Sequence, residues 1–168
     1  SNEQNQTVMI YYIKNSDNKY DVKIWCSEYM IYAPVNSANL FSGLSSCTSI
    51  EFNGLFNTSI ATNFTEMFKS AKVTDLDLSS FDTSNVQTMA EMFNSCNSLE
   101  SLNISNFDFS KVTSTQGMFN GCSSLTNITL NKFNFTNKLT TTAYMFGDCS
   151  KLVTIPNLTT TGSTQVTN

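Results

Sequence analysis

The amino-acid sequence predicts an α/β repeat protein: a right-handed solenoid with a parallel sheet, short helices on the opposite side and a β-rich N-terminal cap. Three observations favour this class. A Phe recurs about every 26 residues, at Phe41, Phe68, Phe93, Phe119 and Phe146. Each repeat also contains an apolar-polar-apolar segment typical of a strand, and a segment with the apolar spacing of a short helix. Ser, Thr and Asn fill many remaining positions, and these residues favour turns.

The composition predicts a folded chain and excludes several classes of function. Hydrophobic residues make up 40% of the chain and charged residues 13%, which favours a packed core over disorder. Nine basic residues, all Lys, face thirteen carboxylates, so the net charge of -4 makes nucleic acid a poor partner. His, the usual proton shuttle and metal ligand, is absent from the sequence. We therefore expect no enzyme, no cofactor and no metal, and we expect no membrane insertion because no long apolar stretch occurs.

The elements expected before the repeats lie in residues 1–37. Strand-like runs occur at 8–13, 22–25 and 29–32, and a polar turn separates the first two. Because the open end of a solenoid needs a cover, this region is interpreted as a β-rich cap, with a small leading domain as the alternative.

Residues 38–158 are expected to form five coils, each with a strand and a short helix. The strand is predicted by two apolar columns, Ile50, Leu76, Leu102, Ile128 and Ile155, and then Phe52, Leu78, Ile104 and Leu130. The helix is predicted by Val86, Met89, Met92, Phe93 and Cys96. Residues 159–168 are expected to be a partial further coil, a degenerate cap or a linker, and we expect the native chain to continue beyond Asn168.

Three of the five cysteines occupy the same place in successive repeats, at Cys96, Cys122 and Cys149. The sequence contains neither Cys-x-x-Cys spacing nor His, so a zinc site is not expected. A repeating column of this kind is typical of buried, reduced thiols that pack as small apolar side chains. We expect these thiols to react slowly in the folded protein.

Two successive repeats carry a shared motif. The first runs from Leu76-Asp77-Leu78 through Phe81-Asp82 to Val86, with Met92-Phe93 and Cys96 after it; the second repeats this as Leu102-Asn103-Ile104, Phe107-Asp108, Met118-Phe119 and Cys122. These motifs resemble the BspA-like leucine-rich repeat family, in particular the twenty-six-residue repeats of mycoplasma and gut-bacterial surface lipoproteins. The resemblance implies a leucine-rich-repeat-like solenoid on a secreted or surface-attached protein that takes part in adhesion, without catalytic residues.

The expected function is therefore that of a non-catalytic extracellular binding module of a bacterial surface protein, with a structural spacer or stalk as the alternative. If Leu76 and Leu78 point inward, their neighbours along the strand must point outward. We name these candidate partner-binding residues the polar face: Asp75, Asp77, Ser101, Asn103, Asn127 and Thr129. Asp75 and Asp77 could also suit a Ca²⁺ or acid-base site, but the Ser and Asn of adjacent repeats favour a solvated face. The expected partner is a protein or glycan of a host or neighbouring cell.

Overall fold

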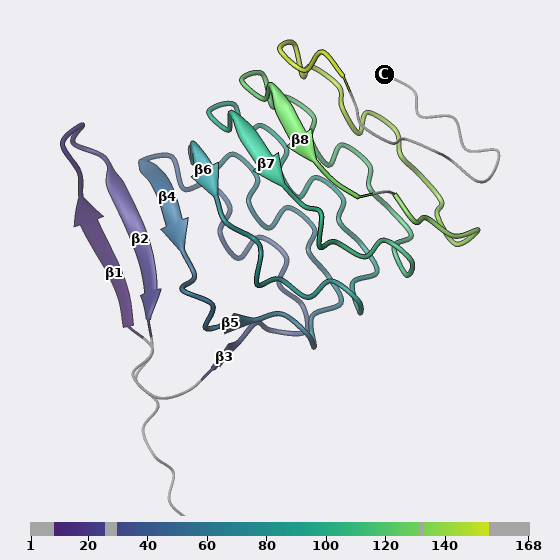
Figure 1. Cartoon of the computed structure of the whole chain (residues 1–168), viewed down its shortest axis with the longest axis horizontal. Helices are drawn as coiled ribbons and strands as arrows, with labels where there is room; N and C mark the ends of the chain where they lie inside the picture. Colours follow the sequence, from purple (N-terminus) through teal and green to yellow (C-terminus); the bar gives the residue numbers. More distant parts are fainter. Residues whose placement is uncertain (1–8, 26–29, 132, 155–168) are drawn as a thin grey trace, which may run out of the picture.

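The computed structural model describes residues 9–25, 30–131 and 133–154, in which eight short strands occur (Figure 1). Three of them precede the repeats: β1 (Met9–Lys14), β2 (Tyr20–Trp25) and β3 (Ile31–Tyr32). The other five are β4 (Cys47–Glu51), β5 (Phe56–Asn57), β6 (Asp75–Leu76), β7 (Ser101–Asn103) and β8 (Asn127–Thr129).

These strands form three small sheets. The largest has the order β1-β2-β4-β6, in which β1 and β2 are antiparallel and the other two pairings are parallel. Strands β3 and β5 form a second sheet, and β7 and β8 a third, both parallel. In the largest sheet Ile50 of β4 pairs with Leu76 of β6, so the first two members of the predicted apolar column are neighbours. Ile155, the last member, and residues 159–168 lie outside the described residues.

The predicted fold class is wrong. Within the described residues the protein contains no helix, and three small sheets replace the single parallel sheet of the expected leucine-rich-repeat-like solenoid. The structure is thus not an α/β repeat with helices opposite a sheet. None of the described segments is a helix with the length and hydrophobicity to cross a membrane.

The residues expected to form helices form turn segments instead. We define the turn segments as residues 36–44, 63–71, 88–96, 114–122 and 141–149; parallel β-bridges join their first residues, from Asn36 to Thr141. In the third segment, the Phe93 amide donates to the Met118 carbonyl of the next segment at 2.8 Å. The amides between such bonds donate three residues back, as Cys96 does to the Phe93 carbonyl at 3.1 Å. An α-helix would require every amide to bond four residues back within its own segment.

Backbone angles explain why a helix does not form here. Glu91 and Ser95 have φ angles of 55° and 60°, in the left-handed region, whereas helical residues have φ near about −63°. The same two positions of the next segment are Gly117 and Gly121, with φ angles of 58° and 75°. Two left-handed residues in each segment turn the chain back sharply, and this geometry repeats along the molecule.

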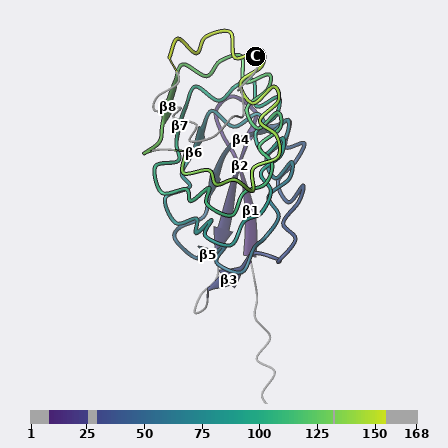
Figure 2. The same ribbon diagram turned by 90° about the vertical axis from the view of Figure 1, so that its right-hand side faces the viewer.

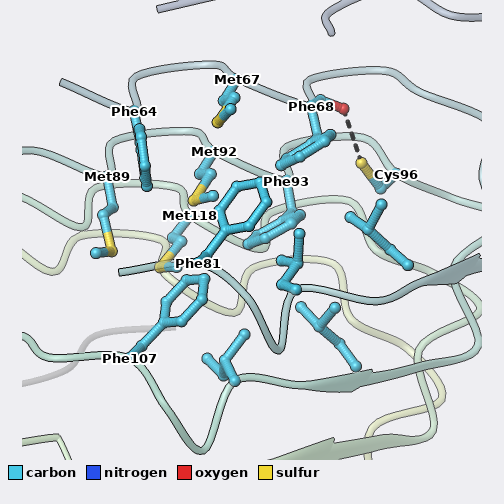
Figure 3. Close-up of a cluster of buried hydrophobic side chains, with 14 of the residues drawn as sticks. Phe64, Met67, Phe68, Phe81, Met89, Met92, Phe93, Cys96, Phe107 and Met118 are labelled. Atoms are coloured by element: carbon cyan, nitrogen blue, oxygen red, sulfur yellow. Dashed lines mark hydrogen bonds between the residues drawn. The ribbon is translucent and has the colours of Figure 1, made fainter. Parts of the chain in front are cut away.

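A column of stacked phenylalanines fills the interior behind the turn segments (Figure 3). Phe68 and Phe93 stack with ring centroids 5.5 Å apart, and Phe93 and Phe119 stack at 5.4 Å. Phe41 and Phe146 extend the column at its two ends. All three central rings are fully buried, so the predicted burial of Phe93 and Phe119 is confirmed.

The two sides of the molecule differ in what they expose. Figure 2 shows β6, β7 and β8 along one side of the ribbon, with turns along the other. Both β7 and β8 have an exposed-buried-exposed pattern, in which the apolar Leu102 or Ile128 points inward. The core therefore lies between the short strands and the turn segments, and the strand side presents polar residues to solvent.

Candidate functional site

The outward direction of the two aspartates is confirmed. Leu76 and Leu78 are buried, with 4% and 1% of their surface exposed. Asp75 and Asp77 are exposed at the alternate positions, as a strand requires. The local cause is the alternation of apolar and polar residues, which places both carboxylates on the solvent side of β6 and of the residue that follows it.

The parallel pairing of β7 and β8 brings four other residues of the polar face together. Ser101 pairs with Asn127, and Asn103 pairs with Thr129. All four side chains are exposed, and in-register parallel neighbours lie about 4.8 Å apart. These two polar pairs are therefore adjacent on the surface.

The six residues do not form one continuous ladder, however. Asp75 pairs with Ser49 of β4, and β6 and β7 belong to different sheets. Between them the Asn106 side-chain amide donates to the carbonyls of Leu78 and Phe81, at 3.0 and 2.8 Å. Side-chain hydrogen bonds thus join the two repeats at a place where strand pairing was expected.

A hollow of about 430 Å³ lies at this junction. Carboxylate, hydroxyl and amide side chains line much of it, including four residues of the polar face: Asp75, Asp77, Ser101 and Asn103. Asn127 and Thr129 are not among its lining residues. The structure therefore gathers two thirds of the predicted face around one polar depression and leaves the other residues beside it.

A second hollow, of about 380 Å³, lies on the other flank of Asp75 and Asp77. Its remaining lining includes Ser49 and Glu51 of β4. Sequence reasoning missed these two residues, although the signal was available. Both flank Ile50, as Asp75 and Asp77 flank Leu76, so the same alternation would have placed them on the polar face.

Hydrogen bonds hold the side chains of this face in place. The Ser79 backbone amide donates to Asp77 Oδ1 at 2.9 Å, and the Ser105 amide donates to Asn103 Oδ1 at 3.0 Å. Both are local turns in which a side chain accepts from the backbone two residues on. The bonds from Ser79 also lower the pKa of Asp77, because they favour its charged form. Asp77 is therefore an anion at neutral pH.

The charge of the face is negative around the aspartates. Lys23 pairs with Glu51 at 2.9 Å on the far flank of the second hollow, and this contact offsets one carboxylate. Within the described residues neither Asp75 nor Asp77 forms an ion pair. In that part of the chain no group of three or more Cys, Asp or Glu side chains is placed to hold a metal ion. The face can therefore offer hydrogen bonds and a modest negative potential to a partner.

Comparison with known proteins identifies a family. Residues 35–157 match the family described as Mycoplasma protein of unknown function, DUF285. The match is to this family and not specifically to the BspA-like leucine-rich repeats that the motifs resemble. No curated protein and no solved structure matches the chain. Because the matched residues make up most of the sequence, this protein belongs to that Mycoplasma family.

Proposed function

We propose that this chain is a non-catalytic binding module of a bacterial surface protein, and that its polar face contacts a partner outside the cell. The observation that supports the proposal is the gathering of Asp75, Asp77, Ser101 and Asn103 around one hollow, with hydrogen-bonding groups directed to solvent. A fixed set of donors and acceptors in a depression is the kind of surface that orients a ligand.

The chemistry of the face favours a polar partner, such as a glycan or a hydrophilic protein surface. Its side chains are short and offer many hydrogen bonds but little apolar area. The exposed carboxylates and the net charge of -4 disfavour nucleic acid, whose phosphates would be repelled. The partner belongs, in this proposal, to a host or neighbouring cell.

Membership of the Mycoplasma family and the resemblance to BspA-like surface repeats support a location outside the cell, either surface-attached or secreted. Kinship with the BspA-like proteins is itself part of the proposal. A face of this kind binds weakly per module, since each hydrogen bond exchanges for one with water. Many copies on one cell surface offset this weakness through avidity.

The proposal is tested by adhesion of protein-coated beads to cultured host cells. Combined substitution Asp77→Lys, Asn103→Lys and Thr129→Lys changes charge and shape across the polar face without touching a buried side chain. We expect adhesion to fall to the level of uncoated beads. Periodate treatment of the cells abolishes adhesion if the partner is a glycan, and protease treatment does so if it is a protein.

A matched control carries the same change in net charge on the turn side. Gln116→Lys, Thr140→Lys and Asp148→Lys replace exposed residues outside both hollows. This control should adhere like the unmodified protein, and both variants should keep its circular dichroism spectrum. Retained adhesion in the polar-face variant, with loss in the control, would reject the face as the contact surface.

A spacer is the second candidate, and a specific observation favours it. The stacked phenylalanines and the hydrogen bonds between turn segments recur from one repeat to the next, as suits a stiff rod. A spacer predicts that coated beads do not adhere at all, whatever the substitution, whereas a binding module predicts loss in the polar-face variant alone.

A further inference from the structure

The cysteine column contains one member that departs from the others. Cys96 and Cys122 are fully buried, but Cys149 is partly exposed, so the expectation of three buried thiols is wrong for Cys149. The reason is position: Cys149 lies in the last turn segment, and within the described residues no further segment covers it. Solvent-borne reagents can therefore reach this sulfur, and the sulfur beside it is shielded.

The backbone holds Cys149 next to Cys122. On either side of the two cysteines, the Phe119 amide donates to Met145 and the Gly121 amide to Gly147, both at 2.8 Å. Backbones bonded in this way run about 4.8 Å apart. Disulfides require Cα atoms about 4.4–6.8 Å apart, so the two turn segments already have the separation that a disulfide needs.

The sulfur atoms are oriented as well as close. Each thiol donates to a carbonyl of the preceding turn segment: Cys122 to Phe93 at 3.1 Å and Cys149 to Phe119 at 3.0 Å. Figure 3 shows the equivalent bond from Cys96 to the Phe68 carbonyl. The thiols of Cys122 and Cys149 also hydrogen-bond to each other.

The environments of the two thiols give them different reactivity. The hydrogen bond from the Cys122 thiol lowers the pKa of Cys149, because it stabilises the thiolate. The pKa of Cys122 is raised, both by that shared bond and by burial. For Cys96, burial raises the pKa to about 12. The thiolate is the form that attacks oxidants, so only Cys149 combines access with activation.

We propose that Cys149 and Cys122 are a redox-active thiol pair that reacts with hydroperoxides and closes to a disulfide. In the first step the Cys149 sulfur attacks the peroxide, the O–O bond breaks, and the products are a sulfenic acid at Cys149 and an alcohol or water. In the second step the Cys122 sulfur displaces the hydroxyl. The S–S bond forms, and the Cys122 proton leaves with the hydroxyl as water. Two electrons pass from the two sulfurs to the peroxide.

The experiment uses the full chain with Cys26→Ser, which removes a thiol outside the described residues. Folded protein is treated with hydrogen peroxide, blocked with iodoacetamide and digested without reduction. Lys132 and Lys138 separate the two cysteines, and Lys111 separates Cys96 from Cys122, so trypsin places each on its own peptide. Mass spectrometry should find the Cys122–Cys149 peptide as the main oxidised product. Before oxidation, iodoacetamide should label Cys149 more than about 10-fold faster than Cys96.

Two variants test the separate roles. In Cys122→Ala the sulfenic acid at Cys149 has no partner, so dimedone should trap it there. In Cys96→Ala, which alters the matched position on the other side of Cys122, the disulfide should form as before. A main product that joins Cys96 to Cys122, thiols that stay reduced under peroxide, or labelling of Cys149 no faster than that of Cys96 would overturn the proposal. The labelling and the disulfide are read in protein that retains Cys122, so they do not depend on whether the alanine variants fold.

Discussion

The turn segments and the short strands β6, β7 and β8 lie on two sides of the same repeats but differ in how they are joined. Each pair of neighbouring turn segments is connected through alternate amides, as from Met89, Glu91, Phe93 and Ser95 to the following segment. On the strand side the pairing is interrupted, because β6 and β7 belong to different sheets. Backbone hydrogen bonding is thus more continuous in the turns than in the strands.

The difference suggests a division of roles between the two sides. The turn side holds the stacked phenylalanines and their backbone hydrogen bonds, so substitutions there act on stability. The strand side directs short polar side chains to solvent around two hollows, so substitutions there should act on binding. The predictions below test this division, and the largest effect is expected first.

Phe93→Ala should remove a central ring of the stacked column. The ring is fully buried between Phe68 and Phe119, so its loss leaves a cavity and should lower the free energy of unfolding by about 3–5 kcal/mol. Urea denaturation measures the change. The strand-side control Thr129→Ala replaces an exposed side chain and should stay within about 0.5 kcal/mol of the unmodified protein. Equal losses in both variants would contradict the division.

Gly121→Val tests the left-handed geometry of the turn segments. Gly121 has a φ of 75°, and a Cβ there would lie 3.4 Å from Cα of Ser95. A β-branched residue is strained at such an angle, so we expect a loss of about 1–3 kcal/mol in thermal or urea unfolding. Ser95→Gly, at the matched position of the preceding segment, should relieve strain and leave stability within about 1 kcal/mol. An unchanged melting curve for Gly121→Val would argue against these turns.

Asp77 should make a small, pH-dependent contribution to stability. Hydrogen bonds from Ser79 lower its pKa in the folded state, so the folded protein favours the carboxylate. The contribution is present above the unfolded pKa of about 3.9 and is lost as pH falls through the lower folded pKa. Urea midpoints between about pH 2 and 6 should therefore fall toward acid, and less steeply in Asp77→Asn than in the unmodified protein. At pH 7 the amide oxygen still accepts from Ser79, so the two proteins should be close in stability; parallel pH curves would show that this bond contributes nothing.

Several features of the fold and the face could be predicted from residue spacing. Alternation placed Leu76 inward and Asp77 outward, and the recurring Phe93 and Phe119 were expected in the core; both predictions are confirmed. These predictions succeed because apolar side chains must leave water, whatever backbone geometry carries them there. Extending the same rule to Ser49 and Glu51 would have completed the polar lining of the second hollow.

The helix prediction was wrong because spacing alone does not identify the hydrogen-bond partner. Val86, Met89, Met92 and Cys96 are three to four residues apart, which suits a helix, but a run of turns with bonds three residues back has nearly the same period. Glycines four residues apart, Gly117 and Gly121, were the available warning, since glycine weakens a helix and favours positive φ.

The sequence by itself determined which side chains are inside, where the repeats recur and which polar residues reach solvent, because burial follows from hydrophobicity and local alternation. Only the tertiary structure decided that each amide of Glu91, Phe93 and Ser95 bonds to a residue in the next repeat instead of its own. It also decided that β6 and β7 leave a hollow between them, and that Cys149 is the accessible end of its column. These outcomes depend on contacts between residues about one repeat apart, and such contacts exist only after the repeats have packed together.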